Sequence, residues 1–162
     1  MNEDRTTVTR GLLSDLLRVS NLTLPRIGER FAAELGASLV ELDLLAELAR
    51  APDRRLRMSD ISQRLTISTT SVTRVVDGLE ARGYAKRALS PEDRRVVYAE
   101  LTDEGAELLD RAHPVSGPAL EECFGRFFTT AEMVEMRALL GKVLHEAHSD
   151  SAEPTENGES SG

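Results

Sequence analysis

The sequence predicts a mainly α-helical fold with one small β-hairpin. Apolar residues make up 40% of the 162 residues and aromatic residues only 4%, which is typical of helices around an aliphatic core. Apolar residues recur at three- and four-residue spacing along most of the chain, and a two-residue period appears only after Gly83. At this length one domain is expected, and no run approaches the ~18 apolar residues of a membrane span.

The cysteine count and the N-terminus indicate the compartment. Cys123 is the single cysteine, so no internal disulfide can form, which fits a reducing environment. Residues 1–10 mix acids with bases, and no apolar stretch follows them as it would in a signal peptide. We therefore expect a cytoplasmic protein without a membrane span, with residues 1–10 forming a flexible N-terminal arm.

Charge is segregated along the chain. The whole chain has 20 basic and 28 acidic residues, a net charge of −8. Residues 54–99 nevertheless hold ten bases and five acids, a net of +5, which leaves −13 for the rest. A basic module in an acidic protein is typical of nucleic-acid binding, but arginine-rich segments also occur on ordinary solvated surfaces. Charge alone leaves both interpretations open.

Two helices are expected before residue 51. The first covers residues 11–35, and Pro25 should kink it or begin a second helix. The next covers residues 38–50. Residues 51–55, with Pro52 and a run of charges, indicate a loop.

The pattern of a helix-turn-helix follows. Ser59 is the expected cap of a short helix that ends at Leu65, and residues 66–68 form a three-residue turn. Ser68 caps a second helix, which Gly83 ends. The apolar stripe of the second helix consists of Val72, Val75, Val76 and Leu79, and its opposite face of Thr70, Thr73, Arg74 and Asp77.

A plain helical hairpin is the alternative to a DNA-binding motif. The surfaces of helical bundles favour Glu, Lys and Gln, which are better helix formers than Thr and Ser. Short hydroxyl side chains suit close approach to base edges. The second helix is therefore predicted to be a recognition helix.

A wing is predicted after the recognition helix. Residues 84–89 and 96–101 have the period of two strands, joined by a turn over residues 90–95. Arg94 and Arg95 end this turn, where they would lie near a phosphate backbone or enter a minor groove.

Helical patterns then continue to about residue 147. Thr102 caps a helix from residue 103, which Pro114, Gly117 and Pro118 should break or bend. Residues 129–132 match a capping box at the start of the last helix. Residues 148–162 are polar and are expected to be a disordered tail.

Four motifs together resemble the MarR family of bacterial transcriptional regulators. They are ISQRL at 61–65, SVTRVVDGLEARGY at 71–84, SPEDRR at 90–95 and LTDEG at 101–105. The resemblance implies a single domain over residues 11–147, with a winged helix-turn-helix at 38–101 and dimerisation helices at 11–35 and 103–147. It also implies a homodimer whose two lobes reach adjacent major grooves. Thr66 stands where the family usually has Gly, so the turn should be tighter or capped differently.

The same resemblance implies the DNA contacts. Asp93 would brace the wing, and Arg95 would enter the minor groove. Major-groove and phosphate contacts would come from residues 68–74. The candidate DNA-binding residues are Ser68, Thr69, Thr70, Ser71, Thr73, Arg74, Arg94 and Arg95.

Other reactive side chains favour structural roles. Cys123 lies among apolar residues, which fits a buried structural cysteine better than an oxidant sensor. His145, Glu146 and His148 could bind a metal, but a solvated helix end is the stronger interpretation. His113 either faces a ligand crevice or caps the bend at Pro114. No catalytic constellation, cofactor motif or metal site is expected.

The sequence therefore predicts a dimeric DNA-binding regulator, most simply a repressor, on a pseudo-palindromic operator. Small phenolic or other aromatic anions are the effectors that the resemblance implies. The alternative is a winged-helix protein-interaction module that has lost DNA binding. The wing separates the two hypotheses, because a protein-binding relic has no need for residues 93–95 at its tip.

Overall fold

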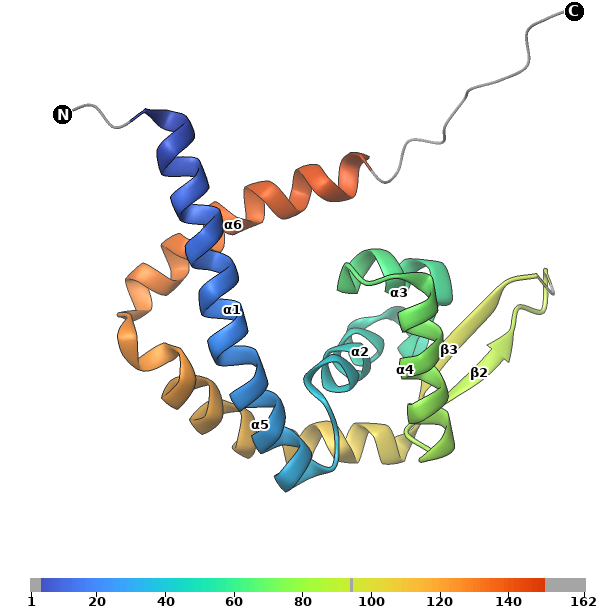
Figure 1. Cartoon of the computed structure of the whole chain (residues 1–162). Coiled ribbons are helices and arrows are strands. Elements are labelled where there is room, and N and C mark those ends of the chain that lie inside the picture. Colours follow the sequence, from blue (N-terminus) through green and yellow to red (C-terminus); the bar gives the residue numbers. More distant parts are fainter. Residues whose placement is uncertain (1–3, 94, 151–162) are drawn as a thin grey trace, which may run out of the picture. The chain divides into compact units, whose positions relative to one another are not determined.

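The elements of the chain follow the predicted order. The computed structural model describes residues 4–93 and 95–150. Its elements are α1 (Arg5–Leu35), α2 (Leu39–Arg50), a 3-10 turn (Pro52–Arg54), β1 (Arg55–Arg57), α3 (Met58–Leu65), α4 (Thr69–Ala81), β2 (Ala85–Leu89), β3 (Val97–Leu101), α5 (Asp103–Cys123), a second 3-10 turn (Gly125–Phe127) and α6 (Thr130–Asp150). The prediction of a mainly α-helical fold with a small hairpin is confirmed (Figure 1).

Two units divide the chain, Met1–Arg126 and Phe127–Gly162. The boundary falls inside the single domain predicted for residues 11–147. In the second unit, α6 begins with the predicted capping box: the Thr129 amide donates to Glu132 Oε2 at 2.7 Å, and the Glu132 amide donates to Thr129 Oγ1 at 3.3 Å. The hydrogen bond from the Thr129 backbone lowers the pKa of Glu132. None of residues 130–146 is buried, so this helix has little core of its own.

The predicted start of α1 and the predicted end of α6 are wrong, and the helix breaks that the sequence allowed at the prolines do not occur. Helix α1 begins at Arg5, so residues 5–10 are helical and not a flexible arm. It continues through Pro25, and α5 continues through Pro114 and Pro118. A proline removes a single N–H donor, and at these exposed positions water can satisfy the freed carbonyl. Helix α6 reaches Asp150, so residues 148–150 of the expected tail are helical, and residues 151–162 lie outside the described residues.

The start of α3 also differs from the prediction. Arg57, and not Ser59, is the N-cap residue, and the Ser59 hydroxyl donates to Asp60 Oδ1 at 3.0 Å. The expected loop over residues 51–55 ends in a strand, because Leu56 is buried and β1 pairs with β3. A three-residue strand is too short for its alternation to be recognised in a sequence.

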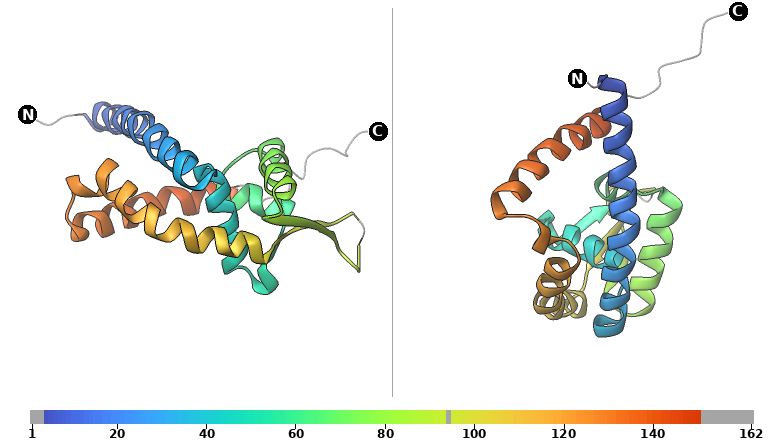
Figure 2. Two further views of the ribbon diagram at one scale, coloured as in Figure 1. Left: turned by 90° about the horizontal axis from the view of Figure 1, so that it is seen from below. Right: turned by 60° about the vertical axis from the view of Figure 1, so that its left-hand side comes forward.

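The three strands form one antiparallel sheet in the order β1-β3-β2. Strands β2 and β3 project from the lobe as a hairpin, which is the predicted wing (Figures 1 and 2). On the other edge, β1 places Arg57 opposite Tyr98. The sheet thereby fixes the wing next to the start of α3.

The core of the first unit is built around α2. Leu44, Leu45 and Leu48 of α2 are fully buried. The predicted stripe of α4 packs against this core, with Val72, Val76 and Leu79 fully buried and Val75 partly buried. Each fully buried aliphatic side chain contributes about 1.5–3 kcal/mol. This packing leaves the opposite face of α4 in solvent.

The helix after the wing is held by a close backbone approach. Thr102 Oγ1 accepts a hydrogen bond from the Gly105 amide at 3.1 Å and donates to the Gly83 carbonyl at 2.7 Å. A Cβ atom on Gly105 would lie 2.1 Å from the Tyr84 carbonyl oxygen. Residue 105 must therefore be glycine for α5 to start here.

The turn between α3 and α4 bends through Thr66. This residue has φ 53° and ψ 41°, the left-handed conformation that favours glycine. The turn is therefore not tighter than a glycine turn. Thr66 itself takes the glycine conformation, at a cost of roughly 1 kcal/mol.

Thr66→Gly should raise the free energy of unfolding by about 0.5–1 kcal/mol, because it relieves this backbone strain at an exposed side chain. Chemical denaturation measures the change. Gly83→Ala is the matched control: Gly83 has φ 76°, and alanine there should lower stability by about 1 kcal/mol. A loss of stability in Thr66→Gly would contradict the strain argument.

Candidate nucleic-acid interface

The outer face of α4 carries short hydroxyl side chains. Ser68 caps the helix, because its Oγ accepts from the Ser71 amide at 3.2 Å. The hydroxyls of these two serines lie 2.8 Å apart, and Thr73 Oγ1 donates to the Thr69 carbonyl at 3.1 Å. All the candidate residues on this helix are exposed, namely Ser68, Thr69, Thr70, Ser71, Thr73 and Arg74.

These local bonds leave part of the hydroxyl capacity free. A hydroxyl has one donor and two acceptor sites. Thr73 uses its donor on its own helix, so its oxygen remains available to accept from a partner such as a base amino group. The face is therefore polar, short and close to the helix backbone.

The wing tip is held by side-chain-to-backbone hydrogen bonds. Ser90 is buried, and its Oγ accepts from the amides of Glu92 at 3.3 Å and Asp93 at 3.4 Å. Asp93 Oδ1 accepts from the Arg95 amide at 2.9 Å, so its carboxylate fixes the backbone before β3. Arg95 is exposed. Arg94, the other candidate at the tip, lies outside the described residues.

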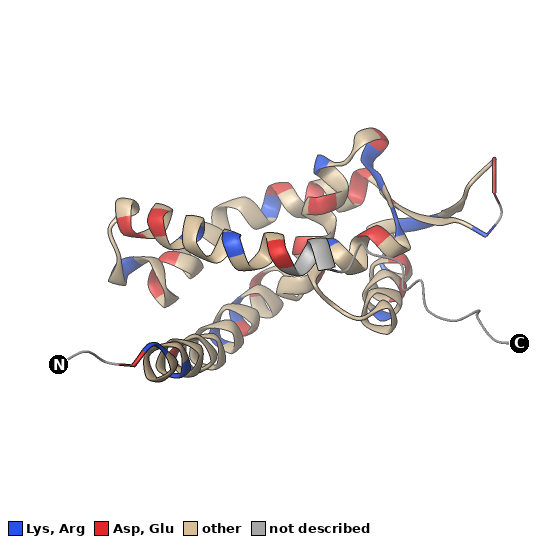
Figure 3. Cartoon of the chain, turned by 90° about the horizontal axis from the view of Figure 1, so that it is seen from above, with Lys and Arg blue, Asp and Glu red and all other residues tan. Residues whose placement is uncertain are grey.

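Most basic residues of the lobe are already neutralised. Among the nine described bases of residues 54–99, six form ion pairs, and basic and acidic segments lie side by side on the ribbon (Figure 3). The pairs are Arg54–Asp103, Arg55–Asp53, Arg64–Glu47, Arg82–Glu41, Lys86–Glu100 and Arg87 with Asp77 and Glu80. Within the described residues, Arg57, Arg74 and Arg95 are the bases of this segment without an ion pair.

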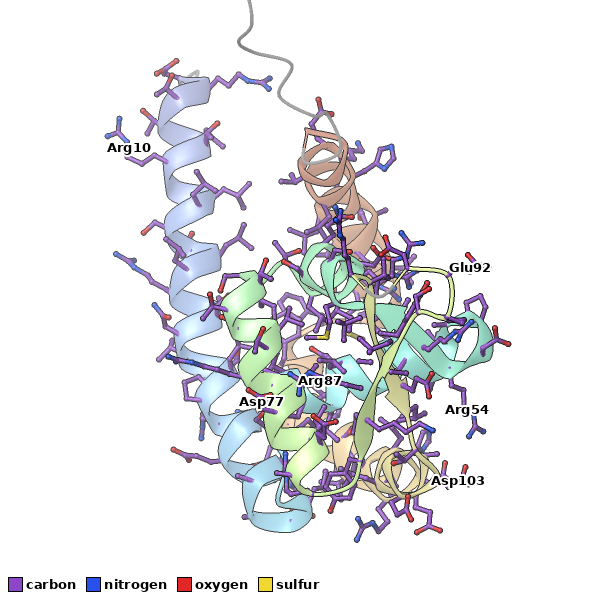
Figure 4. The ribbon with its side chains drawn as sticks, turned by 90° about the vertical axis from the view of Figure 1, so that its right-hand side faces the viewer. Arg10, Arg54, Asp77, Arg87, Glu92 and Asp103 are labelled. Carbon is purple, nitrogen blue, oxygen red and sulfur yellow. The ribbon has the colours of Figure 1, made fainter. Side chains whose placement is uncertain are left out.

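Arg87 joins the recognition helix to the wing. Its guanidinium Nη2 lies 2.7 Å from Asp77 Oδ1, and Figure 4 shows these two residues close together. Arg87 also pairs with Glu80. The hydrogen bond from the Arg87 amide is the main cause that lowers the pKa of Glu80. Asp77, predicted to share the outward polar face, is therefore engaged with β2. This contact sets how α4 lies against the wing.

A hollow of about 460 Å³ lies between α3, α4 and the wing. Of its lining residues, only Thr73 and Arg95 were among the sequence candidates. Arg57 was missed because the sequence does not reveal β1. The arginine run at residues 54–57 is the one signal that could have pointed to Arg57. The lining residues are Arg57, Met58, Ser59, Thr73, Arg87, Arg95, Val96 and Val97.

A second hollow, of about 350 Å³, lies between α1, α2 and α5. His113 lines it, which favours the ligand-crevice interpretation over a cap, since α5 continues past Pro114. Burial raises the pKa of Asp43, the one carboxylate among these residues. The lining is otherwise mostly apolar and contains no Lys or Arg: Phe31, Leu39, Leu42, Asp43, Ala46, Leu109, Ala112, His113, Ser116, Gly117 and Leu120.

The remaining candidates show little sign of a reactive site. Cys123 is half-buried and packs against the core. Within residues 4–93 and 95–150, no three His, Cys, Asp or Glu side chains lie close enough to hold a metal ion. In the same part of the chain, no helix is long and apolar enough to cross a membrane.

Comparisons with known proteins agree on the fold and the kind of protein. A family model described as "MarR family" matches residues 35–96. YkoM, an uncharacterized HTH-type transcriptional regulator of Bacillus subtilis, is 33% identical over 121 residues, which cover 74% of this chain and 76% of YkoM. The transcriptional repressor MprA of Escherichia coli is 31% identical over 100 residues, which cover 62% of this chain and 56% of MprA.

A solved structure extends the similarity to nearly the whole chain. Sco3205, a MarR family transcriptional regulator from Streptomyces coelicolor, was crystallised in complex with DNA. It is 26% identical, has a TM-score of 0.74, and the alignment covers 99% of this chain and 95% of Sco3205. The matched segment of the family model includes the recognition helix, strand β2 and the turn that follows β2.

Proposed function

The chain belongs to the MarR family of transcriptional regulators, and on this basis we propose that it is a repressor that binds a pseudo-palindromic operator as a homodimer. Membership makes it a DNA-binding regulator and not an enzyme. Arg74 and Arg95 carry the proposal, because they lack ion pairs within the described residues and lie on the recognition helix and the wing. Repression is supported by the similarity to MprA, and a cytoplasmic location follows from this role.

The homodimer is supported by apolar side chains that stay exposed. On α1, Leu17 and Leu22 are 66% and 70% exposed, and on α6, Val143 is 68% exposed. Apolar surface gains roughly 25 cal/mol per Å² when it is buried, so helices of this kind need a partner surface. The other exposed apolar residues on these helices include Val8, Leu12, Leu13, Leu24, Val134, Leu139 and Leu144.

The protein should remain a dimer at micromolar concentration, because the terminal helices cannot bury their apolar residues alone. Analytical ultracentrifugation measures the mass. Leu17→Glu together with Leu22→Glu should weaken the dimer, whereas the same change at exposed Arg10 and Arg18 of α1 should not. A folded monomer of the 17.8 kDa chain would contradict the proposal.

Arg95→Ala should weaken operator binding by roughly 1–3 kcal/mol and flatten a preference for A·T-rich flanks, because a narrow minor groove attracts arginine. Asp93→Ala should show a milder form of the same defect, since it frees the Arg95 amide but keeps the side chain. Fluorescence anisotropy on duplexes with A·T and G·C flanks measures both effects. Unchanged binding of Arg95→Ala to both duplexes would favour the alternative, a protein-interaction module.

The α1–α2–α5 hollow is the proposed effector site. The resemblance implies aromatic anions, but this lining offers the Asp43 carboxylate and no Lys or Arg. An aromatic ring with a hydrogen-bond donor or an amine therefore fits the hollow better than a benzoate does. Because the hollow lies between α1, α2 and α5, a ligand there would act on the packing beneath α4.

Tyramine should raise the melting temperature and lower DNA affinity at millimolar concentration, whereas salicylate should do neither, because Asp43 attracts an ammonium group and repels a carboxylate. Thermal shift and anisotropy measure the two effects. Asp43→Asn should remove the discrimination, and Asp110→Asn, an exposed change on α5 outside the lining, should not. A stronger response to salicylate than to tyramine would overturn this choice of ligand class.

A further inference from the structure

We propose that the hollow between α3, α4 and the wing seats a phosphate of the DNA backbone, and that Arg57 is the residue that contacts it. The inference rests on the proposed DNA-binding mode and adds a third contact to it. Arg57 comes from the edge strand β1, which lies outside both the recognition helix and the wing.

The hollow lies between the two elements that are proposed to enter the DNA grooves. A recognition helix in a major groove and a wing in the next minor groove are separated by one sugar-phosphate strand. The hollow lies in that interval, because Thr73 of α4 and Arg95, in the wing turn just before β3, both line it. The backbone strand between the two grooves must therefore pass over it.

The lining of the hollow is positively charged. Three arginines and no carboxylate line the hollow. Arg87 is neutralised by Asp77 and Glu80, which leaves Arg57 and Arg95 as its free positive charges. Asp60 and Asp93 act on Arg57 through space and form no ion pair with it. An anion is the ligand that this lining favours.

Tyr98 holds the Arg57 side chain in place. Arg57 Nε donates to Tyr98 Oη at 3.3 Å, and the guanidinium carbon lies 6.0 Å from the centre of the ring. This hydrogen bond uses Nε and leaves both terminal nitrogens without a partner among the described residues. A guanidinium fixed in this way is suited to two parallel hydrogen bonds to a phosphate.

Arg55 provides a matched control on the same ring. Its guanidinium carbon lies 5.0 Å from the centre of the Tyr98 ring, two residues away on the same strand. Arg55 does not line the hollow, and it has an acidic neighbour, Asp53, at 3.9 Å. A change at Arg55 therefore removes an equal charge beside the same tyrosine without removing the proposed contact.

The experiment compares Arg57→Gln, Arg57→Lys, Arg55→Gln and Tyr98→Phe with the wild-type dimer. The probes are a duplex selected by the protein from a random library and a scrambled duplex of equal length, titrated over a range of salt concentrations. Circular dichroism and melting curves check that each variant is folded.

Arg57→Gln should lower the affinity for both duplexes roughly tenfold, with their ratio unchanged, because phosphate contacts carry no sequence information. The slope of log affinity against log salt should fall by about 0.9 for each lobe. Arg57→Lys should keep the slope but lose affinity, since it retains the charge and loses the fork. Tyr98→Phe should have a smaller effect, and Arg55→Gln should match the wild type.

Three outcomes would overturn the inference. The first is an unchanged slope and affinity in Arg57→Gln, which leaves the proposed function intact if Arg95→Ala still weakens binding. The second is a loss confined to the selected duplex, which would make Arg57 a base contact. The third is an equal loss in Arg55→Gln, which would reduce the effect to general charge. Absence of DNA binding by the wild type would instead refute the proposed function.

Discussion

The packing of the apolar stripe of α4 on α2 is the contact on which the rest of the lobe depends. Val72, Val76 and Leu79 are fully buried against the core, and this fixes the rotation of the helix about its axis. The hydroxyl side chains on the opposite face of α4 therefore face solvent, and no other contact is needed to orient them. Arg87 completes the arrangement, because its ion pairs with Asp77 and Glu80 hold the helix against the sheet that carries the wing.

Charge pairing then decides which bases are available to a ligand. The lobe is arginine-rich, but carboxylates from α2, α4, α5 and the sheet neutralise most of its described bases. Exposed ion pairs of this kind add little stability, about 1 kcal/mol or less each. Their larger consequence is that the unpaired bases lie on the recognition helix, at the wing tip and at the end of β1.

The described part of the first unit contains a buried apolar core and a helix whose apolar residues are largely exposed. The lobe buries its own apolar residues, whereas the N-terminal half of α1 leaves its leucines in solvent. The same holds for α6 in the second unit, where no residue from 130 to 146 is buried. The exposed apolar residues of these two helices need a further surface to cover them, and we propose that a second copy of the chain provides it.

Local chemistry in the sequence was enough for the helix-turn-helix, the capping residues Ser68, Thr102 and Thr129, the two wing strands and the stripe of α4. These features depend on residues within one or two turns of each other, so spacing alone reveals them. The strand β1, the continuity of α1 and α5 through their prolines, and the pairing of each arginine depend on partners far along the chain. Arg57 shows the difference most clearly: it becomes a candidate only when antiparallel pairing brings Tyr98, 41 positions away, under its guanidinium. Contacts of that range leave no periodic signal in a sequence, and only the tertiary structure decides them.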